Sequence, residues 1–161
     1  MSATAASGAA DISVAEPTVA DPAVVSRAET AEQTRTPHYG ERAIAEARLI
    51  CFDNPRPGRT YEVAITLPEF TCCCPFSGYP DFATLRLLYQ PGPRVMELKA
   101  IKLYVNSYRD RAVSHEEVTN RILDDFVAAC DPVWMELEAD FNPRGNVHTV
   151  IRATHGTRQP C

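Results

Sequence analysis

The sequence predicts an α+β fold in which a four-stranded antiparallel sheet carries helices on one face. Two observations indicate this class. Four short segments, residues 61–67, 82–89, 133–141 and 147–153, are apolar or alternate between apolar and polar residues, which is typical of strands. Residues 98–109 and 115–130 instead repeat apolar side chains at helical spacing. The expected order is therefore ββααββ, and no internal repeat is visible.

The first two predicted strands enclose a cysteine-rich loop. The first strand follows the turn-rich residues 53–59 and places four apolar side chains on one face: Tyr61, Val63, Ile65 and Leu67. The consecutive cysteines 72–74 are expected in the loop that follows. The second strand ends where Pro91-Gly92-Pro93 removes backbone donors and favours a turn. These segments predict a β-hairpin with its thiols at the tip.

The two predicted helices have different signals. In the first, Ile101, Tyr104, Val105 and Tyr108 share one face, although its β-branched and aromatic content also permits a strand. The second has a clear beginning, because Ser114 is a favourable N-cap and Glu117 completes a capping box. Asp131-Pro132 ends it. We expect this helix to bury Val118, Ile122, Leu123, Phe126, Val127 and Cys130.

A second hairpin completes the predicted sheet. Residues 133–141 place Val133, Met135, Leu137 and Ala139 on one side, and residues 142–146 form a tight turn before the last strand. A single such sheet leaves two exposed edges and one uncovered face, and closing several sheets into a barrel would remove the edges. We therefore expect a cyclic homo-oligomer with sites between subunits.

Composition limits the class of protein. The chain has 161 residues, of which 45% are hydrophobic and 23% charged, and this suggests one domain, predicted at residues 38–161. Residues 1–37 lack aromatics and lysine, and they are predicted to be a disordered tail. The net charge of −5 argues against direct nucleic-acid binding. No signal peptide or membrane-length apolar run is seen, so we expect a cytoplasmic protein, without a membrane partner, whose six cysteines are reduced.

The most informative segment is residues 69–83, E-F-T-C-C-C-P-F-S-G-Y-P-D-F-A. Cys74 precedes a proline, which favours extended geometry, and Asp81 follows seven residues later across turn residues. A thiol with a nearby carboxyl group suits nucleophilic catalysis with an acid/base partner. From the pattern alone, Cys72 and Cys73 remain competitors, an inert thiol or a zinc ligand remains an alternative, and Asp81 remains explicable as a turn residue.

Other polar residues have both functional and structural interpretations. His115 and Glu116 begin the second helix, where a carboxylate can accept two N–H donors from a guanine-like edge or simply complement the helix dipole. Lys99, Lys102 and Arg144 could together hold cofactor phosphates, or they are an exposed helix face and a turn residue. No Rossmann or Walker glycine motif is present, so a nucleotide would bind by other means.

These segments resemble the family of NADPH-dependent 7-cyano-7-deazaguanine reductases, the nitrile oxidoreductases of queuosine biosynthesis. The resemblance runs from about residue 38 to 160, and four motifs carry it in the family's order: L-P-E-F-T-C-C-C-P-F-S-G-Y-P-D-F-A-T, E-L-K-A-I-K-L-Y, Y-R-D-R-A-V-S-H-E-E and F-N-P-R-G-N. It implies the tunnelling fold, in which ββααββ subunits close into a barrel, and a ring-based homo-oligomer. It also implies tRNA modification as the pathway and NADPH as the cofactor, with no metal.

The resemblance further implies residue roles. Cys74 would attack the nitrile carbon of 7-cyano-7-deazaguanine to give a covalent thioimide, Asp81 would donate the proton, and two hydrides from NADPH would complete the reduction to the primary amine. His115 would position and protonate the intermediate. The implied substrate-binding residues are Met96, Glu97, Leu98, His115 and Glu116, and the implied cofactor-binding residues are Lys99, Lys102 and Arg144.

The chain departs from the family at Cys72 and Cys73, where other residues are usual, and the tail has no assigned counterpart. Three alternatives therefore stay open. The first is a zinc-dependent hydrolase of the same fold, such as a cyclohydrolase. The second is a nitrilase that hydrolyses the thioimide. The third is a ring that binds purines or pterins without catalysis.

Overall fold

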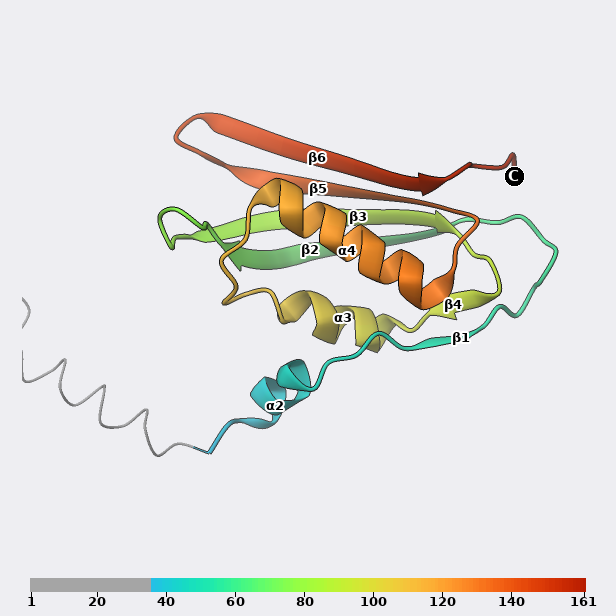
Figure 1. Cartoon of the computed structure of the whole chain (residues 1–161), viewed down its shortest axis with the longest axis horizontal. Helices are drawn as coiled ribbons and strands as arrows, with labels where there is room; N and C mark the ends of the chain where they lie inside the picture. The colour runs from blue at the N-terminus through green and yellow to red at the C-terminus, as the bar shows by residue number, and fades with distance from the viewer. Residues whose placement is uncertain (1–35) are drawn as a thin grey trace, which may run out of the picture. The chain divides into compact units, whose positions relative to one another are not determined.

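The computed structural model describes residues 36–161, and residues 38–161 form one compact unit (Figure 1). The disordered tail predicted for residues 1–37 lies outside the described residues, apart from its last two positions. The elements of this unit are, in order, α2 (Tyr39–Ala45), β1 (Cys51–Asp53), β2 (Val63–Cys73), β3 (Pro80–Gln90), β4 (Arg94–Met96), α3 (Leu98–Asn106), α4 (His115–Cys130), β5 (Trp134–Arg144) and β6 (Val147–Gly156).

The main sheet has the order β2-β3-β5-β6, and every neighbouring pair is antiparallel. Four long strands and two intervening helices confirm the predicted ββααββ order. Both helices cover the same face of the sheet, with α3 against β2 and α4 against β5 and β6 (Figure 1). Strands β2 and β6 are left as the free edges of the sheet.

A β-bulge in β2 decides which cysteine enters the core. Before it, Leu67 pairs with Leu85; after it, Phe70 pairs with Ala83, so β2 uses one residue more than β3. The extra residue reverses the alternation of side chains, because successive strand residues face opposite sides. The apolar face therefore shifts from the odd-numbered Leu67 to the even-numbered Phe70 and Cys72, which are 2% and 0% exposed.

The prediction that all three cysteines lie in a loop is wrong. Strand β2 continues through Cys72 and Cys73, which pair with Asp81 and Pro80 of β3. Only Cys74 lies in the connection, since Pro75 follows it and cannot donate to a strand ladder. The alternating pattern of residues 61–67 predicted the start of this strand but not its continuation past Pro68.

Helix α4 begins and ends where its cap residues predict. The Ser114 side chain accepts a hydrogen bond from the Glu117 N–H at 3.2 Å, and Asp131 ends α4 in the left-handed conformation with φ 50°. Helix α3 ends at Asn106, three residues before the predicted end. Both helices contribute to one core with the sheet, whose buried members include Ile101, Val105, Tyr108, Val118, Ile122, Leu123, Phe126 and Cys130. In contrast, Val133, which the alternating pattern places on the same side as the buried Met135, Leu137 and Ala139, is 42% exposed.

Three short elements were not predicted. Helix α2 buries no residue, and strands β1 and β4 have only three residues each, so none carries a long periodic pattern. Strands β1 and β4 pair with each other, from Cys51 opposite Met96 to Asp53 opposite Arg94. The N–H of Glu97 also donates to the carbonyl of Ile50 at 2.9 Å. This small sheet fixes the position at which α3 begins.

The face of the main sheet opposite the helices is polar. Arg86 bridges Glu138 and Asp140 at 2.8 and 2.9 Å, and Arg152 contacts Glu138 at 2.6 Å. Charged rows of this kind remain hydrated, which agrees with the expectation of one uncovered face. Among residues 36–161, no helix is both long and apolar enough to cross a bilayer.

Candidate functional site

The connection between β2 and β3 is a tight turn that presents Cys74. The N–H of Cys74 donates to the carbonyl of Tyr79 at 2.8 Å, and the carbonyl of Cys74 accepts from the N–H of Gly78 at 2.9 Å. Gly78 has a φ of 72°, a conformation that costs glycine little. The Ser77 hydroxyl accepts from the N–H of Tyr79 at 3.4 Å. Backbone bonds on both sides of Cys74 thus fix the thiol at the tip of the hairpin.

The environment distinguishes Cys74 from Cys72. Burial, followed by the nearby charge of Asp81, raises the pKa of the Cys72 thiol to about 12, so Cys72 is protonated and inert at neutral pH. Cys74 is partly exposed, and its pKa is lowered by hydrogen bonds from the Ser77 hydroxyl and from the N–H groups of Ser77 and Phe76. Donors aimed at sulfur favour the thiolate, which is the nucleophilic form.

Cys73 is held by the segment that leads into α4. Its N–H donates to the carbonyl of Arg111 at 2.9 Å, its carbonyl accepts from the N–H of Val113 at 3.0 Å, and its thiol contacts the Arg109 carbonyl at 3.5 Å. This segment ends at Ser114, the N-cap of α4. One short stretch of chain therefore fixes both the base of the cysteine turn and the start of the helix that carries His115.

Asp81 is the centre of a cluster of polar groups beside the turn. It is 3% exposed, although it carries a carboxyl group. Its Oδ1 accepts from Nη1 of Arg144 at 2.6 Å, and its Oδ2 lies 3.4 Å from Nε2 of His115. The His115 ring stacks on Phe141, with ring centres 3.7 Å apart and planes 10° apart. Side chains from β3, α4 and β5 thus meet at one point, and Phe141 limits the rotation of the imidazole.

The predicted site residues fall into two groups within the subunit. Asp81 contacts both His115 and Arg144, and Glu116, the residue after His115, is exposed in the first turn of α4. Met96, Glu97, Leu98, Lys99 and Lys102 belong to β4 and α3. The start of α3 and the β2–β3 turn lie at opposite ends of the sheet (Figure 1). Arg144, predicted to act with the two lysines, instead belongs to the Asp81 group.

The second group has its own local geometry. Glu97 is the N-cap of α3, and its carboxylate accepts from the N–H groups of Lys99 and Ala100 at 2.9 and 2.7 Å. Met96 is buried, whereas Leu98 is 64% exposed. Lys99 and Lys102 line a hollow of about 300 Å³ between α2 and α3, and neither forms an ion pair within the described residues.

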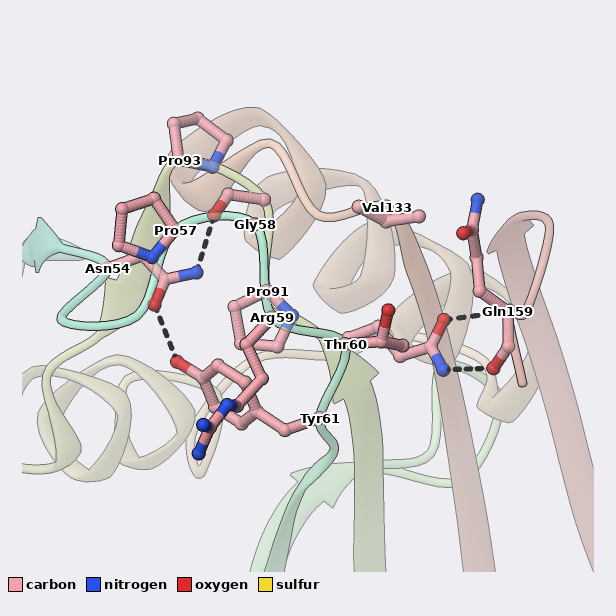
Figure 2. Close-up of a pocket in the computed structure, with 12 residues that line it drawn as sticks. Asn54, Pro57, Gly58, Arg59, Thr60, Tyr61, Pro91, Pro93, Val133 and Gln159 are labelled. Atoms are coloured by element: carbon pink, nitrogen blue, oxygen red, sulfur yellow. Dashed lines mark hydrogen bonds between the residues drawn. The ribbon is translucent and has the colours of Figure 1, made fainter. Parts of the chain in front are cut away.

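Two further hollows flank the sheet. One, of about 430 Å³, adjoins the cysteine turn and is lined by Pro75, Tyr108, Arg111, Ala112, Val113, Ser114, Glu117 and Arg121. The other, of about 400 Å³, is shown in Figure 2, and no predicted site residue lines it. Two of its polar side chains already have partners: Asn54 donates to the Gly92 carbonyl at 2.9 Å, and the Gln90 amide forms hydrogen bonds of 2.6 and 2.8 Å with the backbone of Gln159 (Figure 2). Hydrogen bonds among the residues that line it therefore stabilise this second hollow.

The groups gathered at this site suit a thiol-based reaction. Within the part of the chain that the structure describes, no three His, Cys, Asp or Glu side chains are grouped as metal ligands. The site contains a turn whose hydrogen bonds favour the thiolate form of Cys74. It also contains a buried carboxyl group, Asp81, in contact with the imidazole of His115. Such a set can attack an electrophilic carbon and exchange a proton with the atom beside it.

Two contributors to the site were not predicted from the sequence. Ser77 follows Cys74 by three residues in a turn, and that spacing is the signal for a contact with the thiol. Phe141 is the last buried residue of β5, and a bulge separates it from Arg144. The sequence pattern therefore does not predict that its side chain faces α4. Only tertiary structure brings its ring under His115.

Comparisons with known proteins point to one family. A sequence profile described as QueF-like protein matches residues 80–160. The NADPH-dependent 7-cyano-7-deazaguanine reductase of Synechococcus sp. (strain CC9902) is 83% identical over 130 residues, covering 81% of this chain and 95% of that protein. The reductase of the same name from Synechococcus sp. (strain CC9605) is 84% identical over 128 residues, covering 80% and 99%.

A solved structure shows the fold. The crystal structure of the archaeosine synthase QueF-Like in the apo form matches with a TM-score of 0.55 and 22% identity, covering 65% of this chain and 100% of that one. At this identity the likeness concerns fold alone. It confirms the predicted α+β class and the arrangement of the tunnelling fold within the subunit.

Proposed function

This chain belongs to the family of NADPH-dependent 7-cyano-7-deazaguanine reductases, and we propose that it reduces the nitrile of that substrate through a thioimide on Cys74. The product is the primary amine 7-aminomethyl-7-deazaguanine, in queuosine biosynthesis. The observation that carries the mechanism is the contrast between the thiols. Cys74 has a lowered pKa at an exposed turn, while Cys72 has a raised pKa in the core.

In the first step, the Cys74 thiolate attacks the nitrile carbon. A C–S bond forms, one C–N π pair moves to nitrogen, and that nitrogen takes up a proton. Asp81 is the proposed proton donor, because its carboxyl group lies beside the cysteine turn and contacts His115 at 3.4 Å. His115 is the group placed to return a proton to Asp81 between steps, since an acid and a base in contact can exchange protons as their distance shortens during the reaction.

The later steps reduce the captured carbon to the amine. NADPH supplies one hydride for each of the two reductions, so two cofactors are consumed per nitrile. Between them the C–S bond breaks, and Cys74 leaves with the electron pair as a thiolate. The hydrogen bonds from Ser77 that favour thiolate also make Cys74 a better leaving group. His115, held flat against Phe141, is the proposed source of the proton for the substrate nitrogen.

The binding roles are distributed over both groups of residues. The Glu116 carboxylate would accept hydrogen bonds from the N–H groups of the deazaguanine edge, because it is exposed at the start of α4. Met96, Glu97 and Leu98 would line the substrate pocket. Lys99 and Lys102 fit the cofactor phosphates, since two exposed ammonium groups without acidic partners in the described residues favour a polyanion.

A homo-oligomeric ring would bring the two groups together. Within one subunit they lie at opposite ends of the sheet, so one complete site needs residues from two subunits. Strands β2 and β6 offer free edges for pairing between subunits. Phe76 and Tyr79 in the cysteine turn are 96% and 70% exposed, and Leu98, a member of the other group, is 64% exposed. These apolar side chains suit contacts between subunits or with substrate.

The cytoplasmic location expected from the sequence remains a prediction.

The test is a product and stoichiometry measurement with the purified full chain. We expect NADPH oxidation that depends on 7-cyano-7-deazaguanine, with two NADPH oxidised per amine formed. A carboxylic acid product would instead favour a nitrilase, and activity that follows stoichiometric zinc would favour a cyclohydrolase-like hydrolase. Binding of the substrate without any turnover would favour a non-catalytic purine-binding ring.

A further inference from the structure

Arg144 lies where two irregularities of the second hairpin direct it toward Asp81. A bulge separates the Phe141–Thr149 pair from the Arg144–Val147 pair, so β5 is kinked just before Arg144. Gly145 and Asn146 then close the hairpin with φ values of 54° and 68°, which is the conformation of a two-residue turn. The backbone at the end of β5 is therefore fixed on both sides of Arg144.

The contact that results is short and involves a buried carboxyl group. Nη1 of Arg144 lies 2.6 Å from Oδ1 of Asp81, which is 3% exposed. His115 lies 3.4 Å from the other oxygen, Oδ2. Each carboxyl oxygen thus has a different partner. Without Arg144 the carboxyl group could rotate about its Cβ–Cγ bond, and the oxygen facing His115 would no longer be defined.

We propose that Arg144 is a positioning residue for Asp81 in nitrile capture, the step that precedes any hydride transfer. This inference rests on the proposed function of Cys74 and Asp81. It assigns Arg144 a role different from the phosphate contact expected from the sequence. The two roles are compatible in space, because the Arg144 side chain is 44% exposed and only Nη1 contacts Asp81 within the described residues. They differ, however, in the reaction step they affect.

The step can be isolated by omitting NADPH. The full-length protein is mixed with 7-cyano-7-deazaguanine alone, and the rate of covalent adduct formation is followed by quenched intact-mass measurement. We expect Arg144→Gln to slow adduct formation about tenfold to a hundredfold, the range for losing a charge-assisted hydrogen bond to a reacting carboxyl group. Arg144→Lys should restore part of the rate, because it keeps a positive charge near Oδ1.

A matched control and a double variant separate positioning from general damage. Arg152→Gln removes an arginine that contacts Glu138 at 2.6 Å on the uncovered face, where Arg86 still contacts Glu138. We expect this variant to form the adduct at the wild-type rate. In an Asp81→Asn background, Arg144→Gln should cause little further loss, because the group it positions is already absent.

Several results would overturn the inference. Adduct formation at the wild-type rate in both Arg144 variants, with only the KM for NADPH raised, would leave Arg144 as a phosphate contact. Equal slowing by Arg144→Gln with and without Asp81 would show that it acts elsewhere. If the wild-type protein forms no adduct at all, the proposed function of Cys74 fails, and this inference fails with it.

Discussion

Replacing Asp81 by asparagine keeps the shape of the side chain and removes its ability to carry a proton. In the structure this carboxyl group is almost fully buried, with Arg144 at 2.6 Å and His115 at 3.4 Å. We expect Asp81→Asn to slow adduct formation by about 10²- to 10⁴-fold, the usual contribution of a general acid or base. The protein should remain folded and should still bind the substrate.

The cost in stability should be smaller than for a fully buried ion pair. Removing one partner of such a pair costs about 3–5 kcal/mol because an unpaired charge stays buried. Here the remaining charge, on Arg144, is 44% exposed and can be hydrated. We therefore expect the free energy of unfolding to fall by about 1–3 kcal/mol, the cost of losing hydrogen bonds to a charged group. Urea unfolding followed by circular dichroism measures this.

Asp140 provides a matched control for both measurements. It also has an arginine and a histidine as partners, Arg86 at 2.9 Å and His148 at 2.7 Å, but it lies on the uncovered face of the sheet. Asp140→Asn should leave the rate of adduct formation unchanged and reduce stability less. Adduct formation by Asp81→Asn within about threefold of the wild-type rate would refute the assignment of Asp81 as proton carrier, given the magnitudes above.

Three further predictions concern the thiols and the acid sensitivity of the fold. Ser77→Ala should move the pH midpoint for alkylation of Cys74 upward, because the Ser77 hydrogen bond is the main cause of its lowered pKa; an unchanged midpoint would exclude that cause. Cys72→Ala should still form the adduct while losing about 1–2 kcal/mol of stability as a core truncation; loss of the adduct in a folded variant would argue against Cys74. Glu138 has a lowered pKa, chiefly because Arg152 donates a hydrogen bond to it. Its contribution to stability should be present above its ordinary pKa of about 4.3 and lost as the pH falls through the lower folded value. Glu138→Gln should therefore weaken the acid limb of a stability–pH curve, and an unaltered limb would contradict this.

The elements with long periodic patterns could be predicted from the sequence. Helix α4 begins and ends as expected because Ser114 and Asp131 act through neighbouring residues alone. Strands β1 and β4 have three residues each and pair with one another across the chain, so no local pattern identifies them. Strand β2 was predicted too short, since a bulge after Leu67 changes which residues face the core.

The site shows the same division between local and distant contacts. Cys74 and Asp81 belong to one hairpin, in which Asp81 lies opposite Cys72 and Cys74 begins the turn, so the sequence spacing alone places them at the same end of the sheet. Arg144 is 63 residues away from Asp81 along the chain, and no pattern in the sequence connects the two. The family resemblance implied a cofactor-binding role for Arg144, but the sequence could not say which residue it contacts. The exclusion of Cys72 also depended on tertiary burial, which the bulge controls.

The account depends most directly on the identity of the nucleophile. Intact-mass measurement of the wild-type protein with 7-cyano-7-deazaguanine and no NADPH should show one covalent addition per subunit, and peptide mapping should place it on Cys74. Cys74→Ala should form no adduct and oxidise no NADPH. An adduct mapped to Cys72 or Cys73, or full turnover by Cys74→Ala, would contradict the central claim.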